Sequence, residues 1–497
     1  MDKTDIDSNQ ENIKEEILIG SISGNESLQV KPKFDKKKII IIIIIISIIL
    51  LLIGILVLLY FLVIKSKDKK EEKEDKDKED PYKIPISEEY YFDQNEAIKN
   101  YTINSDFIKL GIISDFQLNT SNTYYVRNIR KTLEKLKKEN VDVILMAGDI
   151  VEYGIPSDYE LYKSIFNEIF PDDNTKPLVF EAMGNHEYYT SKYKMEGYSL
   201  KKNIQMFKDN YNKYPFYHIK INQFHFIFWS MQSFDSDEKY LVHTTWLQKH
   251  IELAEKDLKQ KGDPIFVITH APAKNTVYGS DENSGLWATY NVLKNYENIF
   301  CISGHSHRSM RNERSIWQKD FTGINTQSIA YAALSYKYIN NNFVVKNSYD
   351  SYMGYIAYLY DDKIDLHRYY FHVDEQLEPW YVKFPLEKSS FNYTDDKRKM
   401  MYGIPKVWNN NITINKIDSV YQVKYYQAWH DLAIHSYIFK YTDINKNKKE
   451  INIYGEYYLY NYINNSTEPR YFNVSDIDVN EKYSLIAVDF FDNMVEY

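Results

Sequence analysis

The sequence predicts an α/β domain followed by a β-rich segment. Short apolar runs alternate with polar helical stretches such as Val126–Lys138, and this alternation is typical of a sheet covered by helices. After about Asp395 it stops, and the Tyr- and Asn-rich remainder favours a β-sandwich. The predicted strands are Ile108–Ser114, Val141–Gly148, Leu178–Gly184, Phe224–Trp229, Pro264–Thr269 and Asn298–Gly304.

Composition narrows the class of protein. With 497 residues and 44% hydrophobic residues the chain can build packed cores in roughly two to four domains. The net charge of -9 argues against a nucleic-acid polymer as partner, because no excess of positive charge exists to displace phosphate counterions. Cys301 is the single cysteine, which excludes an internal disulfide and a Cys-based zinc cluster.

An uncharged aliphatic run from Ile39 to Ile64 predicts one transmembrane helix, because it exceeds a hydrocarbon core of roughly 30 Å. The run divides the chain into five predicted parts. They are a polar disordered tail (1–38), the membrane helix (39–64), a charged stalk and linker (65–104), the α/β domain (105–390) and a C-terminal β-sandwich-like domain (395–497).

Lysines flank the run on both sides, but the cluster before it is plainly positive, whereas the segment after it mixes acidic and basic residues. Glycosylation acceptor triplets before the run begin only at Asn25. We therefore expect a type II glycoprotein with the α/β domain lumenal or extracellular; the alternative is a cytosol-facing domain. Acceptors after the run begin at Asn100, Asn119, Asn392, Asn411, Asn464, Asn465 and Asn473.

Metal-ligand residue types follow five of the predicted strands. In open α/β sheets, ligands bind beyond the carboxyl ends of the strands. Each residue alone has an ordinary explanation, such as an Asp that caps a turn, so the prediction rests on the whole ordered series. We assign no metal role to the other histidines, among them His218, His225 and His250. The candidate ligands are Asp115, Gln117, Asp149, Asn185, His270, His305 and His307.

Such a set suits two metal ions. A carboxylate can bridge two cations about 3.5–4 Å apart. A mixed Asp, Asn and His set fits Fe, Mn or Zn better than Mg or Ca. Two divalent or trivalent ions of this kind generate hydroxide near neutral pH and neutralise phosphoryl oxygens. We therefore expect hydrolysis of a phosphate ester by attack of a metal-bridging hydroxide.

The motif series of Asp115, GD, GNHE, a single His and GHSH resembles the calcineurin-like metallophosphoesterases over roughly Ile108 to Pro385. The resemblance implies a four-layer α/β/β/α sandwich. It also implies that His186 stays unligated and protonates the leaving-group oxygen or stabilises the transition state, and that Glu187 orients a His. Asp149 would bridge the two metals, with Asp115 and His307 completing one site and Asn185, His270 and His305 the other.

Three departures from the family pattern refine the prediction. Gln117 stands where many members have His; its amide oxygen can ligate a metal, and the alternative is a weakened, partly occupied first site. Tyr153 and Tyr189 replace the phosphate-binding arginines of Ser/Thr protein phosphatases, which argues against that activity because Tyr makes no bidentate contact. Glu152 occupies the place of the purple acid phosphatase Tyr ligand, which argues against an iron–tyrosinate site.

The leading hypothesis is a membrane-tethered phosphohydrolase that acts on a small phosphomono- or phosphodiester. Arg308, just after GHSH, is a candidate for a contact with substrate phosphate, and a solvated loop arginine is the alternative. The hypothesis of a different class is a catalytically silent adhesion or binding protein that keeps the fold. It would bind, through the C-terminal segment, a protein partner that the sequence does not specify.

Overall fold

The computed structural model describes residues 97–173, 175–231, 244–281, 285–339 and 342–497, which belong to one compact unit. The predicted tail, membrane helix and most of the stalk lie outside the described residues and stay predictions. In the part of the chain that is described, no helix has the length and apolarity needed to cross a bilayer.

Seven strands form a mixed sheet in the order β1-β5-β6-β7-β8-β10-β9. Its central strands β6, β7, β8 and β10 run parallel and are almost wholly buried, as expected for strands covered on both faces. The strands are β1 (Lys99–Tyr101), β5 (Phe216–Ile221), β6 (Phe224–Trp229), β7 (Ile265–Ile268), β8 (Ile299–Ser303), β9 (Ile316–Gln318) and β10 (Thr322–Asn325).

A second sheet has the order β15-β14-β13-β2-β3-β4, with β16 also paired to β14. Strands β2, β3 and β4 run parallel, so their carboxyl ends meet at one edge. The bounds are β2 (Ile108–Ile113), β3 (Val143–Met146), β4 (Leu178–Glu181), β13 (Met353–Leu359), β14 (Lys363–Tyr370), β15 (Glu375–Gln376) and β16 (Trp380–Lys383).

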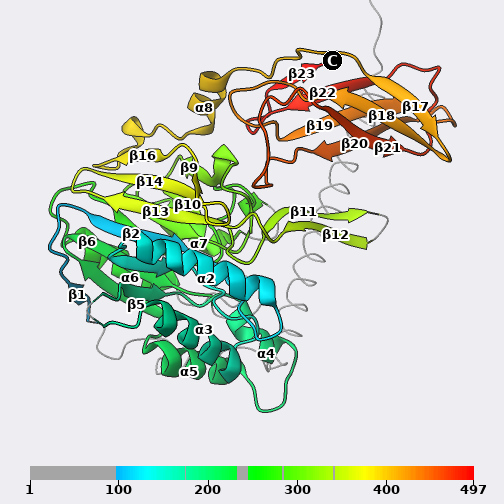
Figure 1. Cartoon of the computed structure of the whole chain (residues 1–497). Coiled ribbons are helices and arrows are strands. Elements are labelled where there is room, and N and C mark those ends of the chain that lie inside the picture. The colour runs from blue at the N-terminus through cyan, green and yellow to red at the C-terminus, as the bar shows by residue number, and fades with distance from the viewer. Residues whose placement is uncertain (1–96, 174, 232–243, 282–284, 340–341) are drawn as a thin grey trace, which may run out of the picture. The chain divides into compact units, whose positions relative to one another are not determined.

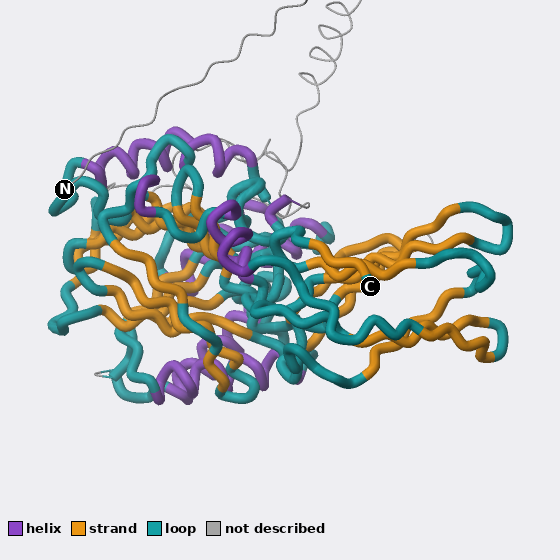
Figure 2. Tube along the Cα trace, turned by 90° about the horizontal axis from the view of Figure 1, so that it is seen from above, coloured by secondary structure: helices purple, strands orange, loops and turns teal. Residues whose placement is uncertain are grey.

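The two sheets share an apolar layer that contains Leu110 and Leu145 from one sheet and Phe226 and Phe266 from the other. Leu136 of helix α2 contacts Gly111 of β2 on the outer face of the second sheet, and α6 packs on β6 and β7 of the first. Helices therefore flank the two stacked sheets (Figures 1 and 2). The predicted mixed α/β fold is confirmed.

Helix α2 shows why these segments are helical. Asn122 caps it by accepting from the backbone of Tyr124 and Tyr125, and Ile129 and Leu133 form its buried face. The helix starts before the predicted Val126 because of this cap. The helices are α2 (Thr123–Lys138), α3 (Pro156–Ile169), α4 (Tyr189–Lys192), α5 (Leu200–Tyr211), α6 (Thr244–Glu255), α7 (Trp287–Leu293) and α8 (Asp395–Tyr402), with short 3₁₀ turns η2 (His186–Tyr188), η5 (Glu313–Ser315) and η6 (Lys388–Ser390).

The C-terminal segment is β-rich, apart from the unanticipated helix α8. Two antiparallel sheets, β17-β18-β21 and β20-β19-β22-β23, share a core that includes Val423, Phe439 and Leu485. Its status as a separate domain stays a prediction. The strands are β17 (Thr413–Ile417), β18 (Val420–Tyr426), β19 (Ser436–Thr442), β20 (Lys448–Tyr454), β21 (Pro469–Val474), β22 (Ser484–Val488) and β23 (Met494–Glu496); a hairpin, β11 (Ala332–Ile339) with β12 (Asn342–Ser348), precedes β13.

A buried ionic cluster around Glu313 ties α8 to the α/β fold. Arg368 of β14 lies 2.9 Å from the Glu313 carboxylate, the Trp380 indole donates to it at 2.9 Å, and Arg398 of α8 pairs with it. Burial would raise the pKa of Glu313, but Arg368 and Arg398 outweigh it and lower the pKa. The carboxylate therefore stays ionised and balances two buried guanidinium groups.

We expect Glu313→Gln to destabilise the protein by about 3–5 kcal/mol, because two buried cations lose their anion. Glu168→Gln is the matched control: it also breaks an Arg–Glu pair, with Arg130, but the Glu168 side chain is 61% exposed, so the expected loss of stability is much smaller. Denaturant unfolding measures both losses, and equal effects would contradict the prediction.

A chain of buried histidines crosses the outer side of the first sheet. His218 Nε2 lies 2.9 Å from His225 Nδ1, and His218 Nδ1 lies 3.1 Å from His250 Nδ1. Burial and these two neighbours lower the pKa of His218 to about 2, and burial and Lys220 lower the pKa of His225 to about 4. Both imidazoles are therefore neutral in the folded protein at pH 5.

These buried histidines predict that the stability of the folded protein falls in acid. The unfolded histidines take up protons as the pH drops below about 6.5, whereas folded His218 and His225 do not, so stability is lost from about pH 6.5 downward. Between pH 7 and pH 5 we expect the free energy of unfolding of His218→Gln to fall by about 1–2 kcal/mol less than that of the wild type. His367→Gln on β14 is the control, and denaturant unfolding across pH measures the slopes. Parallel slopes for all three proteins would refute this reading of His218.

Candidate metal centre

The candidate ligands occupy the loops that leave the carboxyl ends of five strands from the two sheets. All of them except the half-buried His305 are buried: Asp115 and His270 are 0% exposed and Asp149 is 1% exposed. The parent strands are β2 for Asp115 and Gln117, β3 for Asp149, β4 for Asn185, His186 and Glu187, β7 for His270, and β8 for His305 and His307.

These loops carry a concentration of backbone strain. Asp115, Gln117, Asp149, His305 and His307 have positive φ, between 47° and 65°, a region that costs a non-glycine residue about 1 kcal/mol or more. Backbone hydrogen bonds hold the strain: the Asp115 N–H donates to Gly148 O at 3.0 Å, and the Gln117 N–H donates to Asp149 O at 2.9 Å. Strain gathered on candidate ligands is an independent sign of a functional site.

Glu187 locks the loops after β3 and β4 together. Its carboxylate accepts from the backbone N–H of Asp149, Ile150 and Val151 at 3.2, 2.7 and 3.3 Å, and from Gly184 at 2.6 Å. The expected role of orienting a His is therefore corrected: its described hydrogen bonds are to main-chain amides. Burial, together with Asp149, raises the pKa of Glu187 to about 7, against the opposing effect of the Gly184 and Ile150 amides.

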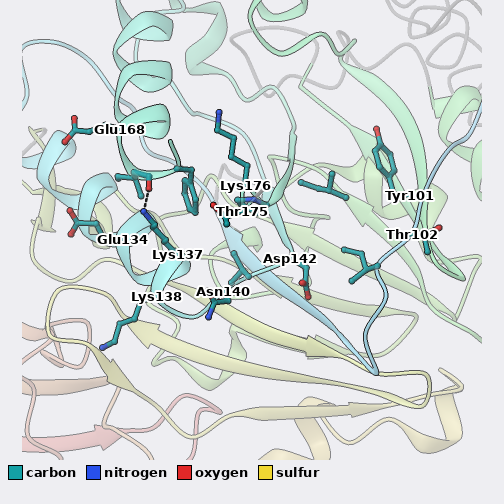
Figure 3. A pocket seen from close by; sticks show the side chains of 16 residues that line it. Tyr101, Thr102, Glu134, Lys137, Lys138, Asn140, Asp142, Glu168, Thr175 and Lys176 are labelled. Atoms are coloured by element: carbon teal, nitrogen blue, oxygen red, sulfur yellow. Dashed lines mark hydrogen bonds between the residues drawn. The ribbon is translucent and has the colours of Figure 1, made fainter. Parts of the chain in front are cut away.

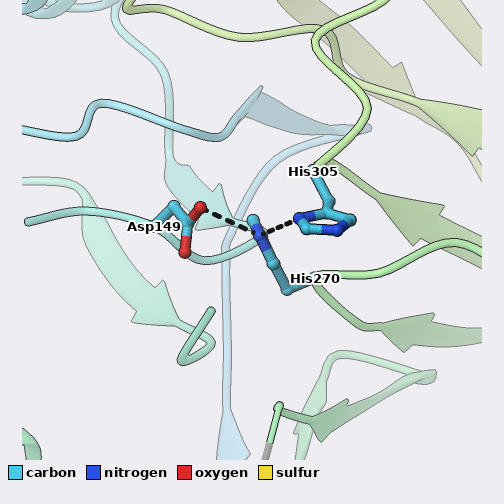
Figure 4. A group of neighbouring side chains, drawn as sticks. All are labelled: Asp149, His270 and His305. Carbon is cyan, nitrogen blue, oxygen red and sulfur yellow. Dashed lines mark hydrogen bonds and ion pairs between the residues drawn. The ribbon is translucent and has the colours of Figure 1, made fainter. Parts of the chain in front are cut away.

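Asp149, His270 and His305 form the centre of the cluster (Figure 4). His270 Nε2 lies 3.1 Å from Asp149 Oδ2 and 3.1 Å from His305 Nδ1. His270 Nδ1 lies 2.7 Å from Ala147 O, so the backbone fixes the ring and leaves Nε2 directed at the carboxylate. One ligand atom from each residue lies within 4.8 Å of the others, the spacing that a shared metal ion needs.

Asn185, Asp115 and His307 extend the cluster on both sides. Asn185 Oδ1 lies 3.0 Å from His270 Nε2, and on the other side His307 Nε2 lies 3.1 Å from Asp115 Oδ1. Asp115 Oδ1 is 3.9 Å from His270 Nε2. The structure thus brings the ligands predicted for two adjoining sites into one cluster, with Asp149 and His270 near its middle.

The electrostatics of the cluster favour bound cations. Burial would raise the pKa of Asp149 and of Asp115, but the facing histidines outweigh it and lower both. Burial would lower the pKa of His270, but Asp149 and Asp115 raise it to about 9, whereas burial and His270 lower the pKa of His305 to about 3. Two buried carboxylates that stay ionised need positive partners, which metal ions supply.

His186 differs from the ligands in its surroundings. Its side chain is 12% exposed, and its Nε2 lies 3.7 Å from Asp149 Oδ2. Its Nδ1 lies 3.2 Å from Glu152 Oε2, and its ring packs on Tyr189 at 3.9 Å between centroids. Burial would lower the pKa of His186, but Asp149 and Glu152 raise it.

Glu152 and Tyr189 are functional candidates that the sequence analysis missed. We considered both only as departures from related phosphatases. Tyr189 follows Asn185 by four residues, about one helical turn into η2 and α4, and this spacing could have found it. Glu152 lies in a loop, and no local spacing pointed to its contact with His186. The Asn185 amide donates to the Tyr189 hydroxyl at 3.1 Å, so Tyr189 contacts a candidate ligand as well as His186.

Gln117 lies at the edge of the cluster. Its amide nitrogen is 2.9 Å from His186 Nε2 and 3.3 Å from His307 Nε2. Amide oxygen and nitrogen are assigned from such contacts, and a rotation of the amide by 180° exchanges them. Gln117 therefore reaches the position from which its oxygen can serve a metal held by Asp115 and His307.

Arg308 is placed differently from the expected contact with substrate phosphate. It is 1% exposed, and its guanidinium donates to Ala333 O at 3.3 Å. Its aliphatic part packs behind the GHSH loop, against the position of Gly279. The neighbouring Arg311 likewise donates to Tyr462 O at 3.5 Å.

A cavity of about 1120 Å³ lies away from this cluster, near the starts of β3 and β4 (Figure 3). Lys137, Asp142 and Lys176 help to line it, and Lys137 Nζ donates to Ile169 O at 2.6 Å. Its lining includes none of the candidate ligands. The cavity and the cluster are therefore separate features at opposite ends of these strands.

Comparison with known proteins agrees with this site. The calcineurin-like phosphoesterase family model matches residues 108–309, a shorter stretch than the resemblance predicted from sequence. No curated protein matches the chain.

Three solved structures are similar in part. A dimetal phosphatase from Danio rerio shares 14% identity, covering 56% of this chain and 100% of its own, with a TM-score of 0.37. GAP50, described as the anchor in the inner membrane complex of Plasmodium, shares 16% identity, covering 57% of this chain and 93% of its own, with a TM-score of 0.41. TT1561 of Thermus thermophilus shares 7% identity, covering 55% of this chain and 98% of its own, with a TM-score of 0.28. The family model matches the stretch whose side chains converge in this cluster, which confirms the predicted resemblance to the calcineurin-like phosphoesterases over residues 108–309.

Proposed function

We propose that this chain is a two-metal phosphoesterase that hydrolyses phosphomono- or phosphodiesters. The observation that supports this most is the convergence of Asp149, His270 and His305 on loops held in a strained conformation. Enzymes keep such strain where the surrounding structure over-determines it and the geometry serves chemistry. A group that served only packing would not need five left-handed residues in one cluster.

The donor set fits two ions of Fe, Mn or Zn. Asp149 would serve both, with Asp115, His307 and Gln117 on one side and Asn185, His270 and His305 on the other. When bound, the ions supply a water of lowered pKa and neutralise negative charge on the phosphoryl group. The chain's own part is to hold the ligands apart from solvent, since burial of their carboxylates strengthens every charge interaction inside the site.

His186 is the proposed proton donor to the leaving-group oxygen. It is more exposed than Asp115, Asp149 and His270, so a substrate can approach it. Asp149 and Glu152 raise its pKa and favour the protonated form that a general acid needs. The contact of Glu152 with Nδ1 of His186 also directs the Nε2 atom of that imidazole into the site. The Tyr189 ring packs against one face of the imidazole.

The alternative, a silent binding protein that retains the fold, receives less support. Loss of function removes the need for strained ligands, yet the described loops keep the predicted ligand types and His186. Membrane attachment through residues 39–64, with the enzyme on the lumenal or outer side, is part of our proposal. Asn392 and Asn473 are exposed, as a glycan requires, and occupancy of either would exclude the cytosolic topology.

The first test is turnover of p-nitrophenyl phosphate and bis(p-nitrophenyl) phosphate by the purified protein with Mn, Fe or Zn. We expect Asp149→Asn to lose both metal and activity, and His186→Asn to keep metal while kcat falls by about 10²–10⁴. Glu152→Gln should lower kcat by about tenfold and move the alkaline loss of activity to lower pH, because the pKa of His186 falls. The preferred ester identifies the substrate class.

The matched control is His367→Asn, which changes a histidine on β14 outside the cluster and should leave turnover unaltered. Hydrolysis of neither ester with any of the three metals, by folded protein, would reject the proposed function. An unchanged pH profile in Glu152→Gln would reject its action on His186.

A second test addresses Gln117. If its amide ligates a metal, Gln117→Ala should reduce bound metal and lower kcat by about tenfold, and Gln117→His should bind metal at least as well as the wild type. Asn119→Ala, two residues further along the same loop, is the control. Metal analysis by plasma emission measures occupancy directly. Unchanged metal content and turnover in Gln117→Ala would show that this side chain is not a ligand.

A further inference from the structure

A chain of hydrogen bonds joins the C-terminal β-segment (residues 395–497) to the loop that follows β7. The Tyr457 hydroxyl donates to the Tyr278 hydroxyl at 3.0 Å, and the same Tyr278 oxygen lies 3.1 Å from His435 Nε2. Tyr278 and His435 are 157 positions apart in the sequence. The loop they meet on also carries His270, so the C-terminal segment contacts an element of the candidate metal centre.

The protons in this chain have one consistent arrangement. Burial lowers the pKa of His435 to about 4, so its imidazole is neutral near pH 7. Because Tyr278 accepts the Tyr457 proton, its own hydroxyl donates to Nε2 of His435, and the Nδ1–H donates to the Ser436 hydroxyl at 3.1 Å. The Tyr278 side chain is therefore held from two directions by groups of the C-terminal segment.

Tyr278 in turn lies against the GHSH loop (residues 304–307) through the residue that follows it. The Arg308 guanidinium is 6.0 Å from the centroid of the Tyr278 ring, at the limit of a cation–π contact. The next residue, Gly279, has a φ of +89°, and a Cβ there would lie 2.7 Å from Arg308 Cγ. The two loops thus approach too closely for a side chain at position 279, and a shift of Tyr278 displaces Arg308.

Arg308 follows His307 directly and is also held by β11. Its guanidinium donates to Ala333 O at 3.3 Å, and the Ala333 N–H donates to His307 O at 2.8 Å. Ala332, the first residue of β11, packs in an apolar cluster with Tyr457 and other residues of the C-terminal segment. The backbone of His307 is therefore held by a strand and a loop that both contact the same segment.

This support matters because the GHSH loop is strained. His305 and His307 have positive φ, 65° and 54°. A residue other than glycine keeps such a conformation only where the surrounding structure outweighs its cost. The contacts at Tyr278, Arg308 and Ala333 supply part of that support, and they depend on the C-terminal segment.

We propose that the C-terminal β-segment positions the GHSH loop, with Tyr278 and His435 as positioning residues for metal binding. The inference rests on the proposed two-metal function, because it concerns the same candidate ligands. Loss of the contact between Tyr278 and His435 lets the loop relax, so that the His305 and His307 imidazoles no longer meet the metal ions in one arrangement. The segment thus contributes to the centre without supplying a ligand.

The test measures the affinity of the full-length protein for Mn and for Zn ions, by equilibrium dialysis with metal analysis, at a temperature where every variant is folded. We expect Tyr278→Phe and His435→Phe to weaken metal binding by about tenfold. His435→Gln should bind metal nearly as well as the wild type, because its amide oxygen can accept from the Tyr278 hydroxyl in place of Nε2.

The matched control is His430→Phe. His430 is a second buried histidine of the C-terminal segment, but its ring contacts Leu432, Gly403 and Asp489 and not the metal loops. Its replacement disturbs the segment itself, and we expect the metal affinity of the folded protein to stay unchanged. A general loss of stability would instead affect both His→Phe variants alike.

Weaker metal binding in Tyr278→Phe and His435→Phe, with recovery in His435→Gln, supports the inference. Unchanged affinity in the first two variants overturns it, as does equal weakening in His430→Phe or an affinity in His435→Gln as low as in His435→Phe. Folded wild-type protein that binds metal but hydrolyses neither test ester contradicts the proposed function alone, because metal affinity still reports on the loop. Wild-type protein that binds neither metal overturns both.

Discussion

The carboxylate of Glu187 is the interaction on which the site depends. It accepts from four main-chain amides, three in the loop after β3 and one before Asn185 in the loop after β4. A buried polar group is costly unless it is hydrogen-bonded, so the two loops must keep the arrangement that supplies these bonds. Because the Asp115 N–H bonds to Gly148 O, the loop after β2 is held to the same frame.

This frame explains why the candidate ligands tolerate strain and mutual repulsion. Asp115 and Asp149 are buried near each other and carry left-handed backbone conformations, and neither feature is stable alone. Two stacked sheets hold the strand ends, and the amide bonds hold the loops. The remaining imbalance is electrostatic: the ionised carboxylates of Asp115 and Asp149 repel each other, and bound metal ions would relieve that repulsion. Strain and charge therefore lead to the same chemical reading as the family match.

Sequence reasoning performed best where the information was local. Strand β6 coincides with its predicted bounds, β2 is one residue shorter than predicted at its C-terminal end, and β8 is one residue shorter at each end, because apolar runs report burial directly. It failed where a role depends on distant partners. Arg308 was considered either a substrate contact or a solvated loop residue, but it is buried against Ala333 O. Glu187 binds amides rather than a histidine, and the helix α8 was taken for β structure. Glu152 and Tyr189 went unassigned because their partner, His186, lies on another loop or a turn away.

The sequence by itself determined the type and order of the candidate ligands, their position after apolar strands, and hence the resemblance to the calcineurin-like phosphoesterases. These follow from residue identity and from the geometry of parallel strands, whose ends share an edge. Tertiary structure alone decided which atoms meet: the approach of His270 to Asp149, the pairing of Glu152 with His186, and the contact of Tyr278 with His435. Such contacts join residues far apart in the chain, and their distances depend on strand register, loop conformation and the packing of the sheets, none of which a local pattern encodes.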